Sequence, residues 1–205
     1  MKRALLLYAK QRFNEMKSSH NQQQSTTDEP ESSSSKLAAP ISPTPNLIIE
    51  AFLPCLNLDS NSLLVDLGCG DGRWLIAANK YTQCKCLGID VDEERLSIAR
   101  EAIIENNLQG MVQVHKQDVF EFMKKSDDFG KVDVIIMYLF REAMTEMGTI
   151  LQQRLDVRDR DGASSNNTEG KQILCVGFAL PGWTPMHEEK VNGVRVYLYS
   201  TKVRA

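Results

Sequence analysis

The chain has few cysteines and histidines, and neither residue type is spaced for a metal site. Its 205 residues include five cysteines and three histidines. The cysteines contain no C-x-x-C pair, and their number is odd. This pattern supports neither a disulfide framework nor a zinc centre. We therefore expect no metal and a reducing, intracellular compartment.

The chain also lacks a long apolar run and an excess of basic charge. No stretch approaches the roughly 18 apolar residues of a membrane span, so none is predicted. A net charge of −3 gives no electrostatic reason to expect a nucleic acid partner. With 42% hydrophobic residues the chain can bury the core of one domain. Oligomeric state does not follow from the composition.

The first 42 residues differ from the rest. On a helix, residues 1–17 form a basic amphipathic segment whose apolar face carries Leu6, Ala9, Phe13 and Met16. Such a segment suits a mitochondrial presequence or a docking helix, so both a cytoplasmic and a mitochondrial location are open. Residues 18–42 are rich in Ser, Gln, Thr and Pro and predict a disordered linker. The folded domain is expected over residues 43–205.

The segment L-L-V-D-L-G-C-G-D-G-R, residues 63–73, has the pattern of a buried strand that ends in a glycine-rich turn. Gly68, Gly70 and Gly72 tolerate positive φ and let the backbone approach a ligand. The apolar run after the turn predicts a helix whose first N–H groups face that ligand. A dinucleotide fingerprint needs a glycine at position 73, where this chain has arginine. The turn thus predicts nucleotide binding but weakens a hydride-transfer hypothesis.

Acidic residues lie at or near the carboxyl ends of this predicted strand and of the next two. Asp66 precedes the turn, Asp90 ends the run 84–89, and Asp118 follows the run 111–115. Asp90 lies near the spacing of about 20 residues at which an acid binds a ribose. The carboxyl ends of parallel strands share one edge of a sheet, so we expect the three acids around one site. Asp133 instead opens a strand at the opposite edge and should be structural.

The predicted elements alternate between strands and helices. Thr44 is expected to cap a helix that runs to about Phe52. Strands are predicted at 63–67, 85–90, 112–116, 132–138, 173–179 and 194–201, and helices at 73–80, 93–106, 120–124 and 142–154. Residues 156–171 predict a long projecting loop. Asn192-Gly193 predicts a tight hairpin before the last strand.

This order predicts an α/β fold: a Rossmann-like, mostly parallel sheet with helices on both faces and a C-terminal antiparallel hairpin. The hairpin is typical of class I methyltransferases, and the motif D-x-G-x-G-x-G resembles their motif I. Four blocks, at 43–53, 65–73, 133–140 and 177–185, resemble those of small protein-lysine methyltransferases. That group includes the mitochondrial enzymes that act on the ATP synthase c-subunit and on the adenine nucleotide translocase.

The resemblance implies a seven-strand sheet, S-adenosylmethionine as cofactor and a lysine in a protein as methyl acceptor. It also implies roles for individual residues. Asp66 holds the methionine amino group, the three glycines give backbone access, Asp90 binds the ribose, Asp118 and Val119 contact the adenine, and Thr44 closes over the cofactor. Asp71 and Arg73 either take part or form a surface pair.

No catalytic residue is identified from the motifs, but an acceptor pocket is expected at the ends of the fourth and fifth strands. Its candidates are Tyr138, Pro181 and Trp183, with packing beneath the hairpin as the alternative for Trp183. Methylation of adenine or glutamine is disfavoured because N-P-P-Y is absent after the fourth strand. A small-molecule methyltransferase and a non-catalytic cofactor-binding module stay open.

Overall fold

The fold is known from a computed structural model, which describes residues 43–161 and 170–201. The predicted N-terminal segment and linker lie outside the described residues. The strands are β1 (Leu63–Leu67), β2 (Lys85–Asp90), β3 (Val112–Lys116), β4 (Val134–Met137), β5 (Gln172–Val176), β6 (His187–Val191) and β7 (Val194–Ser200). The helices are α2 (Asn46–Phe52), α3 (Arg73–Thr82), α4 (Glu93–Glu105), α5 (Val119–Lys125) and α6 (Arg141–Asp161), with short 3-10 turns η1 (Leu53–Cys55) and η2 (Asp127–Gly130).

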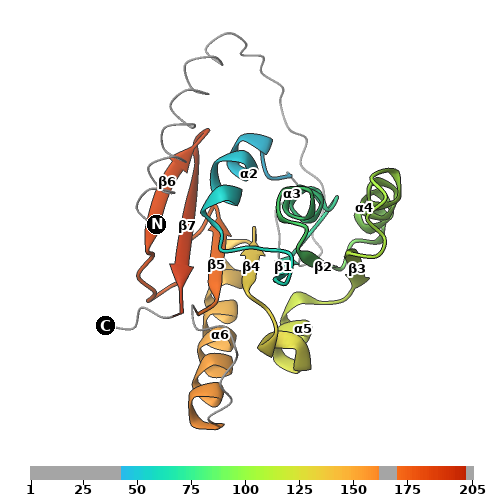
Figure 1. Ribbon diagram of the computed structural model, residues 1–205. Coiled ribbons are helices and arrows are strands. Elements are labelled where there is room, and N and C mark those ends of the chain that lie inside the picture. The colour runs from blue at the N-terminus through green and yellow to red at the C-terminus, as the bar shows by residue number, and fades with distance from the viewer. Residues whose placement is uncertain (1–42, 162–169, 202–205) are drawn as a thin grey trace.

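All seven strands form one sheet in the order β3-β2-β1-β4-β5-β7-β6 (Figure 1). β1 to β5 are parallel, and β7 runs antiparallel to β5 and β6. Asn192 and Gly193 both have positive φ, as a tight hairpin requires. The predicted fold class is confirmed. The chain passes from β1 outward to β3 and returns to β4, so the strand order reverses at β1, where open α/β sheets bind ligands.

Helices cover both faces of the sheet (Figure 1). Leu64 and Ile136 belong to the core beneath α2, α3 and α4, whereas Val65 and Ile135 belong to the core against α5 and α6. This double burial accounts for the apolar strand patterns. Asp66 alternates with Leu64 and therefore faces α3. No helix in the two described ranges combines the length and apolar character needed to cross a membrane.

Some predicted boundaries are wrong for local reasons. β5 ends at Val176 because Gly177 adopts a φ of 86° and turns the chain. Thr44 does not cap α2, because Pro45 occupies the N-cap position and the cap makes no side-chain hydrogen bond. α6 extends to Asp161, into the predicted loop, because residues 155–161 contain no glycine or proline that would end the helix earlier.

Candidate active site

The glycine-rich turn after β1 is fixed by its backbone. Gly68, Gly70 and Gly72 have φ values of 85°, 51° and 74°. The N–H of Gly68 donates to the carbonyl of Ile89 at 2.8 Å, which ties the turn to the end of β2. A Cβ on Gly72 would lie 3.2 Å from Cβ of Ala99 in α4. Side chains are therefore disfavoured by strain at all three positions and by crowding at Gly72, and the backbone is free to contact a ligand.

Asp66 is the most buried acid at this edge, with 3% of its surface exposed. Burial, followed by the charges of Asp90 and Asp71, raises the pKa of Asp66 to about 8. A buried carboxylate under these conditions favours a cation beside it. The site is therefore suited to hold an ammonium group.

Asp90 ends β2 next to the turn and is buried. One carboxylate oxygen accepts from the N–H of Gly70 at 2.8 Å, and the other accepts from the N–H of Asp92 at 3.0 Å. Each oxygen keeps a second acceptor position. Asp90 is therefore held rigidly and can still accept hydrogen bonds from two neighbouring hydroxyl groups.

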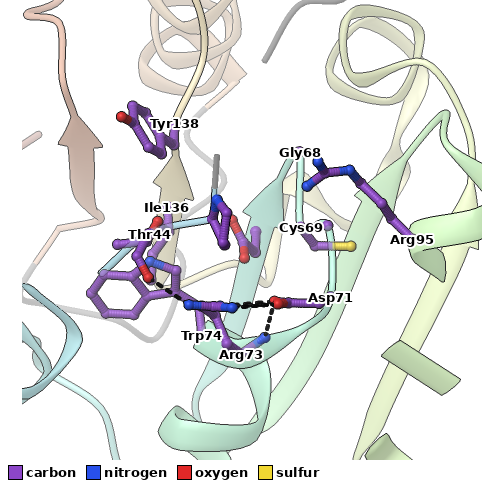
Figure 2. Close-up of a pocket in the computed structure, with 12 residues that line it drawn as sticks. Thr44, Gly68, Cys69, Asp71, Arg73, Trp74, Arg95, Ile136 and Tyr138 are labelled. Atoms are coloured by element: carbon purple, nitrogen blue, oxygen red, sulfur yellow. Dashed lines mark hydrogen bonds and ion pairs between the residues drawn. The ribbon is translucent and has the colours of Figure 1, made fainter. Parts of the chain in front are cut away.

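Asp71 and Arg73 form an ion pair beside the turn, 2.6 Å between Oδ2 and Nη2. Arg73 Nη1 also donates to the carbonyl of Thr44 at 2.9 Å (Figure 2). Burial alone would raise the pKa of Asp71, but the hydrogen bonds and charge of Arg73 outweigh it and hold that pKa below its usual range. The pair therefore fastens the segment before α2 to the start of α3.

These groups lie around a cleft at the carboxyl end of β1. Its lining contains five predicted site residues: Thr44, Asp66, Gly68, Gly70 and Tyr138. Thr44 is buried although its side chain caps no helix. Figure 2 shows Thr44 and Tyr138 on one side of the cleft and the glycine turn on the other. Gly72 and Asp90 are adjacent in the chain or the sheet to these residues but are not part of the lining.

Tyr138 follows β4 and owes its position to a glycine. A Cβ on Gly177 would lie 2.9 Å from Cε2 of Tyr138, so only glycine lets the ring lie where it does. Gly177 also has a φ of 86°, which favours glycine independently. Tyr138 and Ile136 therefore form an apolar wall on the β4 side of β1, whereas Asp90 lies on the β2 side.

Pro181 and Trp183 lie elsewhere. The Trp183 ring meets Tyr199 of β7 edge-on, with 6.1 Å between centroids. A Cβ on Gly148 of α6 would approach both Pro181 and Trp183 to about 4 Å. Trp183 thus packs on the core beneath α6, opposite the face that carries Tyr138. The structure does not bring Trp183 to the cleft and matches the packing alternative.

Asp118 and Val119 begin α5. The Asp118 carboxylate accepts from the N–H groups of Phe120 and Glu121 at 2.8 and 2.9 Å and so caps the helix. The N–H of Gln117 donates to the carbonyl of Asp90 at 2.9 Å, which places this turn beside the ribose-binding candidate. Val119 is buried. Asp133, at the opposite edge, accepts from the N–H of Leu63 at 2.9 Å, as its predicted structural role requires.

Sequence reasoning missed Trp74 and Arg95, which also line the cleft. Arg95 Nη1 lies 3.6 Å from where a Cβ on Gly70 would be, and its Nε lies 3.5 Å from Asp92. Trp74 is 3% exposed. Both residues stand within ordinary helix patterns, so only the packing of α3 and α4 against the turn reveals them. Within the described ranges, no cluster of three or more histidine, cysteine or acidic side chains could hold a metal.

The arrangement suits a ligand with a nucleoside at one end and an amino acid at the other. Asp90 can accept from ribose hydroxyls, Asp66 can pair with an ammonium group, and the glycine turn leaves room for the chain between them. The apolar wall at Tyr138 borders a third position, where a group carried by the ligand could meet another molecule.

Comparisons with known proteins agree with this geometry. The family model of the ANTKMT methyltransferase domain matches residues 66–187. A protein-lysine N-methyltransferase of Saccharolobus islandicus is 27% identical over 165 residues, 78% of this chain and 92% of that protein. A ribosomal protein L11 methyltransferase of Caldanaerobacter subterraneus is 33% identical over 42% of this chain and 26% of that protein.

A solved structure shows the same fold. The RNA methyltransferase from Salinibacter ruber superposes with a TM-score of 0.66 at 22% identity, covering 80% of this chain and 96% of that one. The family match spans motif I, Asp90, Tyr138 and the loop after β5, and it confirms the resemblance found in the sequence. The chain belongs to the ANTKMT methyltransferase domain family and is a class I methyltransferase that uses S-adenosylmethionine.

Proposed function

We propose that the protein is a protein-lysine N-methyltransferase. The observation that carries this proposal is the apolar end of the cleft, where Tyr138 is held against Gly177 opposite the buried carboxylates. A small apolar site of this kind suits a single aliphatic amine. The relative from Saccharolobus islandicus, which bears this activity in its name and aligns over most of both chains, supports the same acceptor.

The proposed reaction requires the protein to position the acceptor amine and to exclude water from it. When bound, S-adenosylmethionine supplies a methyl group already activated on a sulfonium. A free lysine has a pKa of about 10.4, and only its neutral amine attacks a methyl group. Desolvation between Ile136 and Tyr138 lowers the pKa of the amine and so favours the reactive form. The Tyr138 face attracts a cation by roughly 0.5–2 kcal/mol, which helps the ammonium to enter.

The proposal gives each predicted site residue a role. On the cofactor side, Asp66 pairs with the methionine ammonium, Asp90 accepts from the ribose hydroxyls, and Thr44 covers the cofactor. The glycine turn contacts it through backbone, and Asp118 with Val119 borders the adenine. Pro181 and Trp183 act at a distance, by holding the loop after β5 against α6.

The test is the identity of the labelled product. The protein is incubated with methyl-labelled cofactor and fractionated cell extract, and protein, RNA and small molecules are then separated. We expect label in protein and methyl-lysine after acid hydrolysis, with much less label when Asp90→Ala replaces the wild type at limiting cofactor. Label confined to RNA or to small metabolites would overturn the lysine assignment and leave the methyltransferase class intact. Cofactor binding without any labelled product would indicate a non-catalytic module.

We also propose that residues 43–205 form the S-adenosylmethionine-dependent methyltransferase domain. Removal of residues 1–35 should leave cofactor affinity and melting temperature nearly unchanged, because the linker that follows residue 17 has almost no apolar residues to contribute to the core. Loss of folding on removal would contradict this. The five cysteines are free thiols, which fits a reducing compartment, cytoplasmic or mitochondrial. A reporter fused to residues 1–35 distinguishes the two compartments.

A further inference from the structure

Trp74 carries a buried donor that the fold does not use. Its side chain packs in the core beneath α2, α3 and α4. Within the described part of the chain, Nε1 of Trp74 is the one buried side-chain nitrogen or oxygen without a hydrogen-bond partner. Native proteins rarely leave such a donor unpaired. An unpaired N–H in this position therefore points to a partner that binds later.

The place of Trp74 narrows the choice of partner. Trp74 is the second residue of α3 and lines the cleft together with Thr44 and Asp66. Figure 2 shows its indole next to Thr44, on the side of the cleft away from Arg95. We therefore infer that the hydrogen-bond acceptor for Nε1 of Trp74 belongs to the ligand that occupies this cleft.

The charged side chains around the cleft indicate which chemical group of the ligand accepts this hydrogen bond. Asp66 offers a buried carboxylate to an ammonium, whereas Trp74 offers an N–H to an acceptor. The nearby cations are already engaged, since Arg73 pairs with Asp71 and Arg95 lies against Asp92. An α-amino acid carries an ammonium and a carboxylate on one carbon. The first-turn N–H groups of α3 also favour an anion at this end of the cleft.

We propose that Nε1 of Trp74 donates a hydrogen bond to the α-carboxylate of the methionine moiety of the cofactor, while Asp66 pairs with its ammonium. This inference rests on the cofactor assigned above and not on the lysine acceptor. Trp74 is then a cofactor-binding residue that contacts the amino acid end of the cofactor. It favours the cofactor over analogues that lack the carboxylate.

The test compares two ligands on two proteins. Calorimetry measures S-adenosylhomocysteine and its decarboxylated analogue on wild type and on Trp74→Phe. We expect Trp74→Phe to weaken S-adenosylhomocysteine about tenfold and the decarboxylated analogue less than about twofold. Equal losses for both ligands, or no loss for either, would overturn the proposal. Failure of the wild type to bind S-adenosylhomocysteine would overturn the cofactor assignment as well.

A second measurement uses the wild-type protein and needs no Trp74 variant. The chain has two tryptophans, so ¹⁵N labelling gives two indole N–H signals, and Trp183 outside the cleft serves as internal control. S-adenosylhomocysteine should shift the Trp74 signal strongly, and the decarboxylated analogue should shift it much less. Equal shifts with both ligands would contradict a bond to the carboxylate.

Discussion

The β2 side and the β4 side of the cleft are held by different forces. On the β2 side, Asp90 and the glycine turn are fixed by hydrogen bonds to backbone N–H and carbonyl groups. On the β4 side, Tyr138 is held by contact with Gly177, a side chain against a backbone. Hydrogen bonds fix the geometry of the β2 side, whereas the shape of the β4 side can change when a single side chain is replaced. Cofactor affinity and acceptor choice should therefore respond to separate substitutions.

The largest effect is expected on the β2 side, at Gly88. A Cβ there would lie 2.6 Å from both Sγ of Cys69 and Cδ1 of Leu75, so alanine forces the turn and α3 away from β2. Gly88→Ala should lower the free energy of unfolding by about 3 kcal/mol. Urea unfolding of the two proteins measures this difference in the free energy of unfolding. Gly110→Ala is the control because a Cβ at Gly110 meets nothing within 4 Å. Similar stabilities of the two variants would show that the turn does not depend on close packing.

Asp90→Ala should weaken binding of S-adenosylhomocysteine by about 2 kcal/mol, because two hydroxyl groups lose a charged acceptor. Calorimetry gives the dissociation constant, and thermal unfolding confirms that the variant is folded. Asp92→Ala removes a neighbouring carboxylate that caps α4 and should change affinity by less than about twofold. Unaltered binding in a folded Asp90→Ala protein, or a preference for NAD, would rule out the proposed ribose site.

The pH dependence of stability reports on Asp66. Its pKa in the folded chain is about 8, above the ordinary 3.8. The folded state therefore holds the proton more tightly, and the resulting stabilisation is lost as pH rises towards 8. Unfolding of the unliganded wild type should become easier by about 1 kcal/mol per pH unit near pH 6. Asp66→Asn should remove this slope, and a parallel slope in both proteins would contradict the assignment.

The smallest effect is expected on the β4 side. Gly177→Ala should displace the Tyr138 ring at a cost of about 1 kcal/mol in kcat/KM for the protein acceptor, with cofactor affinity unchanged. Gly182→Ala is matched to it, because Gly182 also has a positive φ, 77°, but a Cβ there meets no atom within 4 Å. If the two variants lose the same activity, backbone strain and not the ring is responsible.

The contrast between the two sides also explains what the sequence could predict. The turn, Asp66 and Asp90 depend on chain segments that are close in sequence, and glycine spacing together with strand ends locates them. The β1, β2 and β3 boundaries were predicted correctly for the same reason. Trp183 could not be placed, because its face of the sheet depends on how the loop after β5 packs against Tyr199 and α6. Trp74 was likewise hidden inside an apolar run, where nothing separates a packing ring from a binding one.

The strand order has a consequence for synthesis of the chain. β1, β2 and β3 are neighbours both in sequence and in the sheet, so they can pair as they leave the ribosome. β7, by contrast, is made after β6 yet lies between β6 and β5. Until β7 arrives, β5 presents an open edge of five apolar or amide-bearing residues. Such an edge is prone to intermolecular pairing. A nascent chain is therefore most exposed to aggregation in the interval between synthesis of β5 and β7.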